Sequence, residues 1–180
     1  MRYHLKGFTL IEAMIVLLIA AILLAVAIPA WSNAASAAHN GATRSVLASS
    51  VLDAVRHSAL MGAEVVVCPV TSGAQCSGRF DWSGGWIVFA DLDGNRVRDP
   101  HETVVKQVTA LEGGVRLRTT AGRTRLVFQP NGGNAGSNVT FTMCDKRGVA
   151  KASTLVLAND GRLRQGAPTA AAAQACVYGG

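Results

Sequence analysis

The chain has 180 residues, a formal net charge of +6 and 49% hydrophobic against 16% charged residues. This length suits one domain with a small appendage, and the composition is too apolar for an intrinsically disordered chain. The positive mean hydropathy of +0.28 arises from one N-terminal stretch, so a multispan transporter and a purely cytosolic protein are both excluded.

The N-terminal segment predicts one membrane-spanning helix. Arg2 and Lys6 precede an apolar run from Phe8 to Ile28, which would form about 31 Å of helix at roughly 1.5 Å per residue. Positive charges ahead of the run keep the N-terminus in the cytoplasm and the rest of the chain on the exported side. Glu12 interrupts the run, and a carboxylate there needs a partner or a position shallow enough to stay hydrated.

The start of this run resembles the leader and cleavage site of type IV pilins and type II secretion pseudopilins. The string Lys6-Gly7-Phe8-Thr9-Leu10-Ile11-Glu12 carries the resemblance. It implies that residues 1–7 are a leader, that a prepilin peptidase cuts between Gly7 and Phe8, and that Phe8 is then N-methylated. It also implies that Glu12 pairs with a subunit's N-terminal ammonium during assembly, because each charge removes the other's desolvation cost. Pro29 falls where the family often has a helix-kinking proline.

Residues 30–62 predict an amphipathic helix that continues the spanning segment 8–29 into a globular domain of residues 63–180. Alanine and leucine favour the helix, and Gly62 can supply the left-handed residue that ends it. The apolar face is expected to comprise Leu47, Val51, Leu52, Val55 and Ala59.

Beyond Gly62, seven runs rich in Val, Thr, Leu and Phe predict strands separated by turn clusters. These runs are Glu64–Pro69, Trp86–Ala90, Thr103–Val108, Val115–Thr119, Thr124–Phe128, Val139–Met143 and Thr154–Ala158. Short strands with short loops favour an antiparallel sheet packed on the helix, which gives an α+β fold. The alanine tract Ala170–Ala173 is expected to be a loose tail.

A long N-terminal helix followed by strands resembles the GspH/FimT family of minor pilins and pseudopilins. Further motifs match in order: Cys76-Ser77-Gly78, Trp82, Gly85-Trp86-Ile87-Val88-Phe89, Asp91, Phe128-Gln129-Pro130-Asn131-Gly132 and Thr140-Phe141-Thr142-Met143-Cys144. The resemblance implies a type IV pilin-like fold, in which the first half of the helix is transmembrane and the second half packs on an antiparallel β-sheet domain. It also implies other pilin subunits as partners.

Four cysteines, Cys68, Cys76, Cys144 and Cys176, follow the membrane segment. The exported side is oxidising in Gram-negative cells, which favours two disulfides, and three connectivities are open. We favour Cys68–Cys76, which closes a short loop, and Cys144–Cys176, which ties down the tail. A zinc site is the alternative, but there is no Cys-x-x-Cys and no neighbouring His pair.

Residues 91–102 are the candidate metal site. Oxygens of Asp91, Asp93, Asn95, Asp99 and Glu102 fall at positions 1, 3, 5, 9 and 12 of an EF-hand count. The glycine stands at the fourth position instead of the sixth, and two arginines would repel a cation. A polar hairpin loop is therefore preferred, and calcium remains open. Without a metalloprotease motif, a P-loop or a nucleophile elbow, the sequence predicts no enzyme, no cofactor and no metal.

Positive charge is concentrated near the C-terminus. From Gly113 to Gly180 nine basic residues oppose two acidic ones, a net charge of +7, whereas residues 30–112 carry a net charge of −2. The arginines at 116, 118, 123 and 125 are interpreted as solvent faces of alternating strands, because a spacing of two puts each pair on one side.

The segment Asp160-Gly161-Arg162-Leu163-Arg164 is the candidate DNA-binding site. Arg162 and Arg164 project from one face of the chain beside Gly161, which permits close backbone approach and suits contact with successive phosphates. FimT-type minor pilins used for DNA uptake carry a Gly-Arg-x-Arg motif near the C-terminus, and this segment resembles it. The preceding loop is expected to widen the patch with Lys146, Arg147 and Lys151. Duplex DNA would be bound weakly, with strong salt dependence and little sequence preference.

The function predicted from these features is that of a minor type IV pilin that binds extracellular DNA for uptake in natural transformation. The chain would be a single-pass inner-membrane protein with a periplasmic C-terminal domain before it enters the pilus at the cell surface. Its partners would be other pilin subunits, the prepilin peptidase and DNA. A minor GspH-like pseudopilin of a type II secretion system and a structural minor pilin that primes pilus assembly are the alternatives.

Overall fold

The computed structural model describes residues 7–71, 73–136 and 138–179. Arg2 and Lys6, on which the predicted orientation depends, lie outside the described residues. The elements are α1 Leu10–Met61, β1 Glu64–Pro69, β2 Trp86–Asp91, β3 Val104–Val108, β4 Arg116–Thr119, β5 Leu126–Phe128, β6 Val139–Cys144, the 3-10 helix η1 Val149–Lys151, β7 Ser153–Leu157, β8 Leu163–Gly166 and α2 Ala170–Tyr178. The chain divides into two compact units, Met1–Ala35 and Ser36–Gly180.

The described part of the first unit is mainly the N-terminal half of α1. Thr9 caps the helix, because its Oγ1 accepts the backbone N–H of Glu12 at 3.3 Å. The side chains at positions 7–31 are all exposed, and the most apolar 18-residue window of α1 has a mean hydropathy of 3.0. By length and composition this helix can cross a membrane. It continues through Pro29.

The C-terminal half of α1 packs on the second unit through a more polar face than the sequence predicts. Its buried residues are Ser36, Asn40, Thr43, Leu47, Ser50, Val51, Ala54 and Ser58. Leu47 and Val51 lie on the predicted face, but Leu52 is 63% exposed and Ala59 is exposed too. The face of α1 that packs on the sheets is therefore rotated about the helix axis from the apolar face that the sequence predicts. Gly62, with φ at 64°, ends it as predicted.

Two buried serines on this face, Ser50 and Ser58, have hydrogen-bond partners nearby and can therefore replace apolar side chains. Ser50 Oγ donates to the carbonyl of Val46 at 2.9 Å and accepts the indole N–H of Trp86 at 3.0 Å. Ser58 Oγ lies 3.1 Å from the carbonyl oxygen of Gln129. These bonds let the helix backbone approach the strands while both serine hydroxyls stay hydrogen-bonded.

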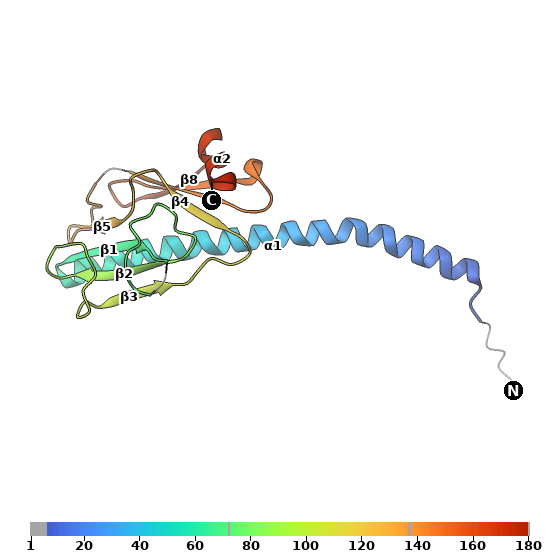
Figure 1. Ribbon diagram of the computed structural model, residues 1–180, viewed down its shortest axis with the longest axis horizontal. Coiled ribbons are helices and arrows are strands. Elements are labelled where there is room, and N and C mark those ends of the chain that lie inside the picture. Colours follow the sequence, from blue (N-terminus) through green and yellow to red (C-terminus); the bar gives the residue numbers. More distant parts are fainter. Residues whose placement is uncertain (1–6, 72, 137, 180) are drawn as a thin grey trace, which may run out of the picture. The chain divides into compact units, whose positions relative to one another are not determined.

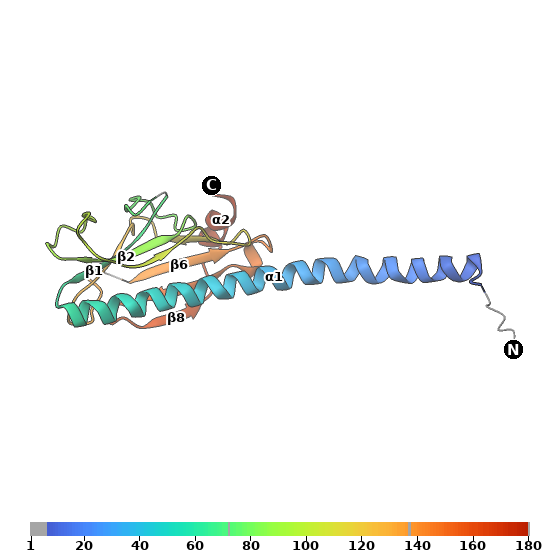
Figure 2. The same cartoon turned by 90° about the horizontal axis from the view of Figure 1, so that it is seen from below.

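The strands form two antiparallel sheets where the sequence predicts one (Figure 1). The first sheet has the order β3-β2-β1-β5 and the second has the order β4-β6-β7-β8. Figure 2 shows the C-terminal half of α1 running alongside the strands of both sheets. All seven predicted strands are present, with ends shifted by no more than two residues.

Two elements at the C-terminus are absent from the prediction. Residues 163–166 form an edge strand, β8, whose register partners are Thr154–Leu157 of β7. The expected loose tail at Ala170–Ala173 is wrong, because these residues begin α2. Thr169 caps this helix by accepting the N–H of Ala172 at 3.2 Å, and alanine has the highest helix propensity of all residues.

The main core lies between α1 and the inner faces of both sheets. Its largest members include Trp82, Trp86, Phe128 and Phe141. A second, smaller core covers the other face of β1 and β2 and contains Val66, Cys68, Val70, Ile87, Phe89 and Val127. Disulfides join Cys68 to Cys76 and Cys144 to Cys176, which is the favoured pairing. Both cores and both disulfides thus belong to the unit Ser36–Gly180.

Candidate functional site

The segment from Ala158 to Arg164, called here the β7–β8 turn, contains the glycine and the two arginines of the predicted DNA-binding motif. Gly161 has φ at +78°, and its N–H bonds to the carbonyl of Ala158 at 3.0 Å. This left-handed conformation closes the turn and is one that glycine adopts without steric cost. Gly161 packs against the carbonyl oxygen of Gly132, to which a Cβ would lie at 3.5 Å. The turn is thereby supported by the loop between β5 and β6.

Arg162 is exposed and paired with its neighbour Asp160. Its Nε donates to Asp160 Oδ2 at 2.6 Å, and the Nη2 atom lies 2.5 Å from the same oxygen, with the arginine side chain 72% exposed. The guanidinium of Arg162 lowers the pKa of Asp160 below its usual value. A guanidinium has five N–H donors, so Arg162 retains donors for a second anion.

Arg164 lies on β8 directly opposite Val156 of β7. It is exposed, and among the described residues its side chain forms no hydrogen bond and no ion pair. Opposed residues of neighbouring strands point to the same face of a sheet. Arg164 therefore projects from the outer face, while Gln165 points the other way and accepts a hydrogen bond from Arg44 of α1 at 3.1 Å.

The structure separates Lys146, Arg147 and Lys151 from this turn, so the expectation that they widen the same patch is wrong. They lie in the β6–β7 connection, at the opposite end of β7 from residues 158–162. Five strand residues span about 16 Å, so the two groups occupy opposite ends of the sheet.

Arg147 has a structural role. Its Nε and Nη2 atoms donate to the two carboxylate oxygens of Asp145 at 2.8 and 2.6 Å. The Asp145 side chain is 0% exposed, and it also accepts a hydrogen bond from Asn40 of α1 at 3.0 Å. The hydrogen bond from Arg147 lowers the pKa of Asp145. This charged cluster joins the β6–β7 connection to α1.

Arg116 and Arg118 hold the C-terminal helix and are not simply a solvent face. Arg116 donates to the carbonyl of Val177 at 2.9 Å. Arg118 donates to the carbonyls of Ala175 and Gly179 at 2.5 and 2.6 Å, and its guanidinium lies over the ring of Phe80, 5.0 Å from the centroid. Cations bonded to C-terminal carbonyls stabilise a helix end.

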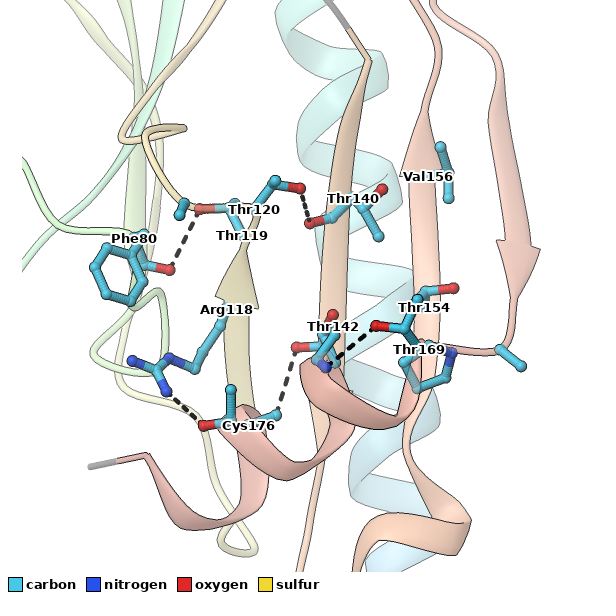
Figure 3. Close-up of a pocket in the computed structure, with 15 residues that line it drawn as sticks. Phe80, Arg118, Thr119, Thr120, Thr140, Thr142, Thr154, Val156, Thr169 and Cys176 are labelled. Carbon is cyan, nitrogen blue, oxygen red and sulfur yellow. Dashed lines mark hydrogen bonds between the residues drawn. The ribbon is translucent and has the colours of Figure 1, made fainter.

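A groove of about 710 Å³ lies between α2 and the outer face of the second sheet. Figure 3 shows its threonine-rich floor, with Thr142 and Thr154 on neighbouring strands and Arg118 extending from β4 toward α2. Because Arg118 bonds to α2, this groove offers no uncommitted cation among its lining residues. Arg164 lies on the same face, next to Val156 at its edge.

The acidic loop after β2 is internally bonded. Glu102 accepts the N–H groups of Leu92 and Asp99 at 2.9 and 3.0 Å, and Asp91 accepts those of Gly94 and Arg96 at 3.0 Å each. Burial raises the pKa of Asp91. Asp91, Asp93 and Glu102 each bring one oxygen within 4.8 Å of the others. The carboxylates cap backbone amides, which accounts for the loop without an ion.

At the N-terminus, the predicted processing residues are accessible. Gly7 precedes α1 with no neighbour within 4 Å of its Cβ position, and Phe8 is 85% exposed. Glu12 is exposed in the first turn of α1, where a carboxylate interacts favourably with the helix dipole. The residues of the predicted cleavage site are thus open to another protein.

Two family models match the chain. The model described as prokaryotic N-terminal methylation motif matches residues 4–28, and the model described as type II transport protein GspH matches residues 47–161. The chain belongs to the GspH family. It is a type IV pilin-like minor pilin or pseudopilin, a structural subunit and not an enzyme, as the sequence predicts.

Solved structures of low identity resemble this member of the GspH family. The type IV minor pilin FimU of Pseudomonas aeruginosa PAO1 is 13% identical, with a TM-score of 0.50 over 77% of this chain and 89% of FimU. The minor pseudopilin EpsH from the type 2 secretion system of Vibrio cholerae is 15% identical, with a TM-score of 0.49 over 72% of this chain and 98% of EpsH. No curated protein sequence matches the chain. The likeness to FimU agrees with the type IV pilin-like fold.

Proposed function

We propose that this GspH-family subunit is a minor type IV pilin that binds duplex DNA through the β7–β8 turn, for DNA uptake in natural transformation. The observation that carries the proposal is the pair of exposed guanidinium groups of Arg162 and Arg164 beside Gly161. Arg164 has no anionic partner within hydrogen-bonding distance among the described residues, and Arg162 retains free donors. Both suit phosphate oxygens, which a guanidinium can bind in a bidentate manner.

The apolar half of α1 and the methylation motif are consistent with an inner-membrane anchor that later enters a filament. Within this proposal, prepilin peptidase cuts after Gly7 and methylates Phe8, and Glu12 then pairs with a subunit's N-terminal ammonium. The unit Ser36–Gly180 faces the periplasm before assembly. Its two disulfides support an oxidising, exported location.

Binding at this turn would be electrostatic and independent of sequence. The turn presents arginines and a glycine backbone but no element shaped to enter the major groove, so phosphates are the groups it can contact. Each phosphate contact releases condensed counterions, which lowers the logarithm of the affinity by about 0.9 per tenfold increase in salt. Two arginines would therefore contribute about 1.8 to the salt slope.

The test uses the full-length chain in neutral detergent and fluorescence anisotropy with a 30-bp duplex. We expect the Arg162→Gln/Arg164→Gln variant to lose about tenfold in affinity at 0.1 M salt and about 1.8 in salt slope. The control, Lys146→Gln/Lys151→Gln, removes the same charge at the other end of β7 and should bind nearly as wild type. Equal affinities of wild type and the arginine variant would refute the proposed site.

Asp160 offers a second test in the opposite direction. Asp160→Asn removes the anion that competes for Arg162, so it should raise DNA affinity by several-fold. In cells, the arginine variant should assemble into pili but lower transformation frequency, which separates a defect in DNA capture from a defect in assembly.

The alternative role is that of a minor pseudopilin in type II protein secretion, and the description of the matching family model favours it. Deletion would then abolish exoprotein secretion and leave DNA uptake unchanged. A structural minor pilin that primes assembly would instead show loss of pili and no DNA affinity.

A further inference from the structure

A second group of arginines surrounds two adjoining clefts in the same unit. The first cleft, of about 160 Å³, is lined by Arg96, Arg98 and Arg125. The second, of about 360 Å³, is lined by Arg96, Arg123 and Arg125. Within the described part of the chain, neither lining includes an aspartate or a glutamate. The four arginines come from the β2–β3 and β4–β5 connections, which are far apart in sequence.

Two of these arginines are committed to contacts within the protein. Arg96 Nε donates to Glu64 at 3.1 Å, and this bond raises the pKa of Arg96. Arg125 donates to the backbone carbonyl of Arg96 at 2.8 Å. These contacts hold the two connections together and fix the shape of both clefts.

The other two arginines have uncommitted guanidinium groups. Arg98 Nε is buried and has no hydrogen-bond partner in the described structure, and a buried donor left unpaired is energetically unfavourable. The Arg123 side chain forms no hydrogen bond or ion pair with the described residues, and its Nη1 would lie 2.9 Å from a Cβ on Gly136. An anion in the clefts would satisfy both.

The carboxylates of the nearby acidic loop are bonded within their own loop and do not line these clefts. Asp91 and Glu102 are 2% and 3% exposed, and their oxygens accept backbone N–H groups. Asp93 and Asp99 both accept hydrogen bonds from the Asn95 side chain. The charged residues that line the clefts are the four arginines, with no carboxylate among the described lining residues.

The clefts and the β7–β8 turn lie on either side of one loop. Arg123 contacts this loop at Gly136, and Gly161 contacts it at Gly132. The chain from Gly132 to Gly136 extends at most about 14 Å. With the contact at each end added, Arg123 and the β7–β8 turn are separated by about 20 Å or less. Duplex DNA carries one phosphate per roughly 1.7 Å of axis, so about 12 phosphates fall within this span.

We propose that the arginine clefts are a second phosphate-contacting site for the duplex bound at the β7–β8 turn. Arg98 and Arg123 provide the contacts, while Arg96 and Arg125 position the two connections. This inference rests on the proposed DNA-binding function and adds to it a surface that continues over residues 132–136. The extended contact gives the subunit a footprint of several base pairs instead of a single point of attachment.

The test compares matched double variants of the full-length chain in neutral detergent with the same 30-bp duplex. Arg98→Gln/Arg123→Gln removes two charges whose guanidinium groups form no hydrogen bond or ion pair with the described residues, so folding is expected to be unaffected. We expect about a tenfold loss of affinity at 0.1 M salt and a decrease of about 1.8 in salt slope. Lys146→Gln/Lys151→Gln is the charge-matched control, for which little change is expected.

The outcomes separate this inference from the proposed function. If the cleft variant binds like the control while Arg162→Gln/Arg164→Gln loses affinity, the cleft proposal is overturned and the turn remains the binding site. If only the cleft variant loses affinity, the turn is not part of the surface, and both the shared footprint and the proposed site are refuted. If both variants lose affinity and salt slope, the combined surface is established.

Discussion

Replacement of Arg147 by methionine tests whether the buried cluster around Asp145 stabilises the domain. Arg147→Met keeps an unbranched apolar stem but removes the guanidinium and with it both side-chain hydrogen bonds to the carboxylate. Asp145, whose side chain is 0% exposed, then retains only the backbone N–H of Arg147 and the amide of Asn40. A charge that stays buried after losing its partner is strongly destabilising.

The expected loss in the free energy of unfolding at pH 7 is about 3 kcal/mol, the lower end of the range for breaking a buried ion pair. We use the lower end because the Arg147 side chain is 17% exposed. With a urea slope of about 2 kcal/mol per M, the unfolding midpoint falls by about 1.5 M. The assay is urea unfolding of a fragment that begins at Ser36, followed by the fluorescence of the buried Trp82 and Trp86.

The cost of this substitution depends on pH in a defined direction. Hydrogen bonds from Arg147 lower the pKa of Asp145 in the folded protein, so the stability they provide is complete above the ordinary aspartate value of about 3.9. It is lost as the pH falls through the lower folded-state pKa. The difference between wild type and Arg147→Met should therefore shrink as the pH falls from 5 toward 3, because protonation removes the buried charge in the variant first.

Lys146→Met is the matched control, since it removes one positive charge from the exposed neighbouring position. It should change stability by less than about 0.5 kcal/mol. The reasoning is refuted if Arg147→Met unfolds at the same urea concentration as this control at pH 7. It is also refuted if the deficit of Arg147→Met grows as the pH falls.

Three further outcomes are expected. Gly85→Ala should prevent folding or cost about 3 kcal/mol or more, because φ is +98° and a Cβ would collide with the backbone that follows β3; wild-type thermal stability would contradict this. Loss of the Cys144–Cys176 bond should lower the free energy of unfolding by about 3.7 kcal/mol and loss of Cys68–Cys76 by about 2.5 kcal/mol, because the bonds close loops of 32 and 8 residues. Urea unfolding of the two paired-alanine variants measures both losses, and the reverse order would contradict the prediction. Glu12→Gln keeps a side chain suited to the first helical turn but removes its charge, so cleavage should be normal and incorporation into pili reduced; unchanged amounts in sheared pili would show that the ammonium pairing does not matter.

The composition of the short runs and the turn residues between them predict the strands, but not the division of the strands into two sheets. Runs such as Glu64–Pro69 are dense in β-branched residues and bounded by glycine, so their identity depends on local preference. The order of strands depends on packing against α1, which no local pattern contains. β8 was missed because Arg164, Gln165 and Gly166 have low strand propensity, and its pairing with β7 overrides that preference.

One local signal in the sequence indicates α2. Thr169 followed by four alanines is typical of a helix start, because threonine caps a helix N-terminus and alanine has the highest helix propensity. The patch predicted around Arg162 and Arg164 also includes Lys146, Arg147 and Lys151, which lie at the other end of β7. Sequence spacing cannot show that Arg147 pairs with a buried Asp145 that also accepts a hydrogen bond from Asn40. It also cannot show that Arg118 bonds to α2, so charge alone predicts a larger patch than the structure contains.

The edge position of β8 gives Arg164 a second consequence, for solubility. An unpaired edge strand is a template on which another copy of the chain can add a strand, and charged side chains on the edge oppose this association. Arg162 and Arg164 are two residues apart along this edge. Pairing of two β8 strands would bring these like charges together, which is electrostatically unfavourable. The same arginines that can bind a polyanion therefore oppose the addition of a second copy of this strand. Light scattering should detect self-association of Arg162→Gln/Arg164→Gln if this repulsion keeps the wild-type chain apart from other copies.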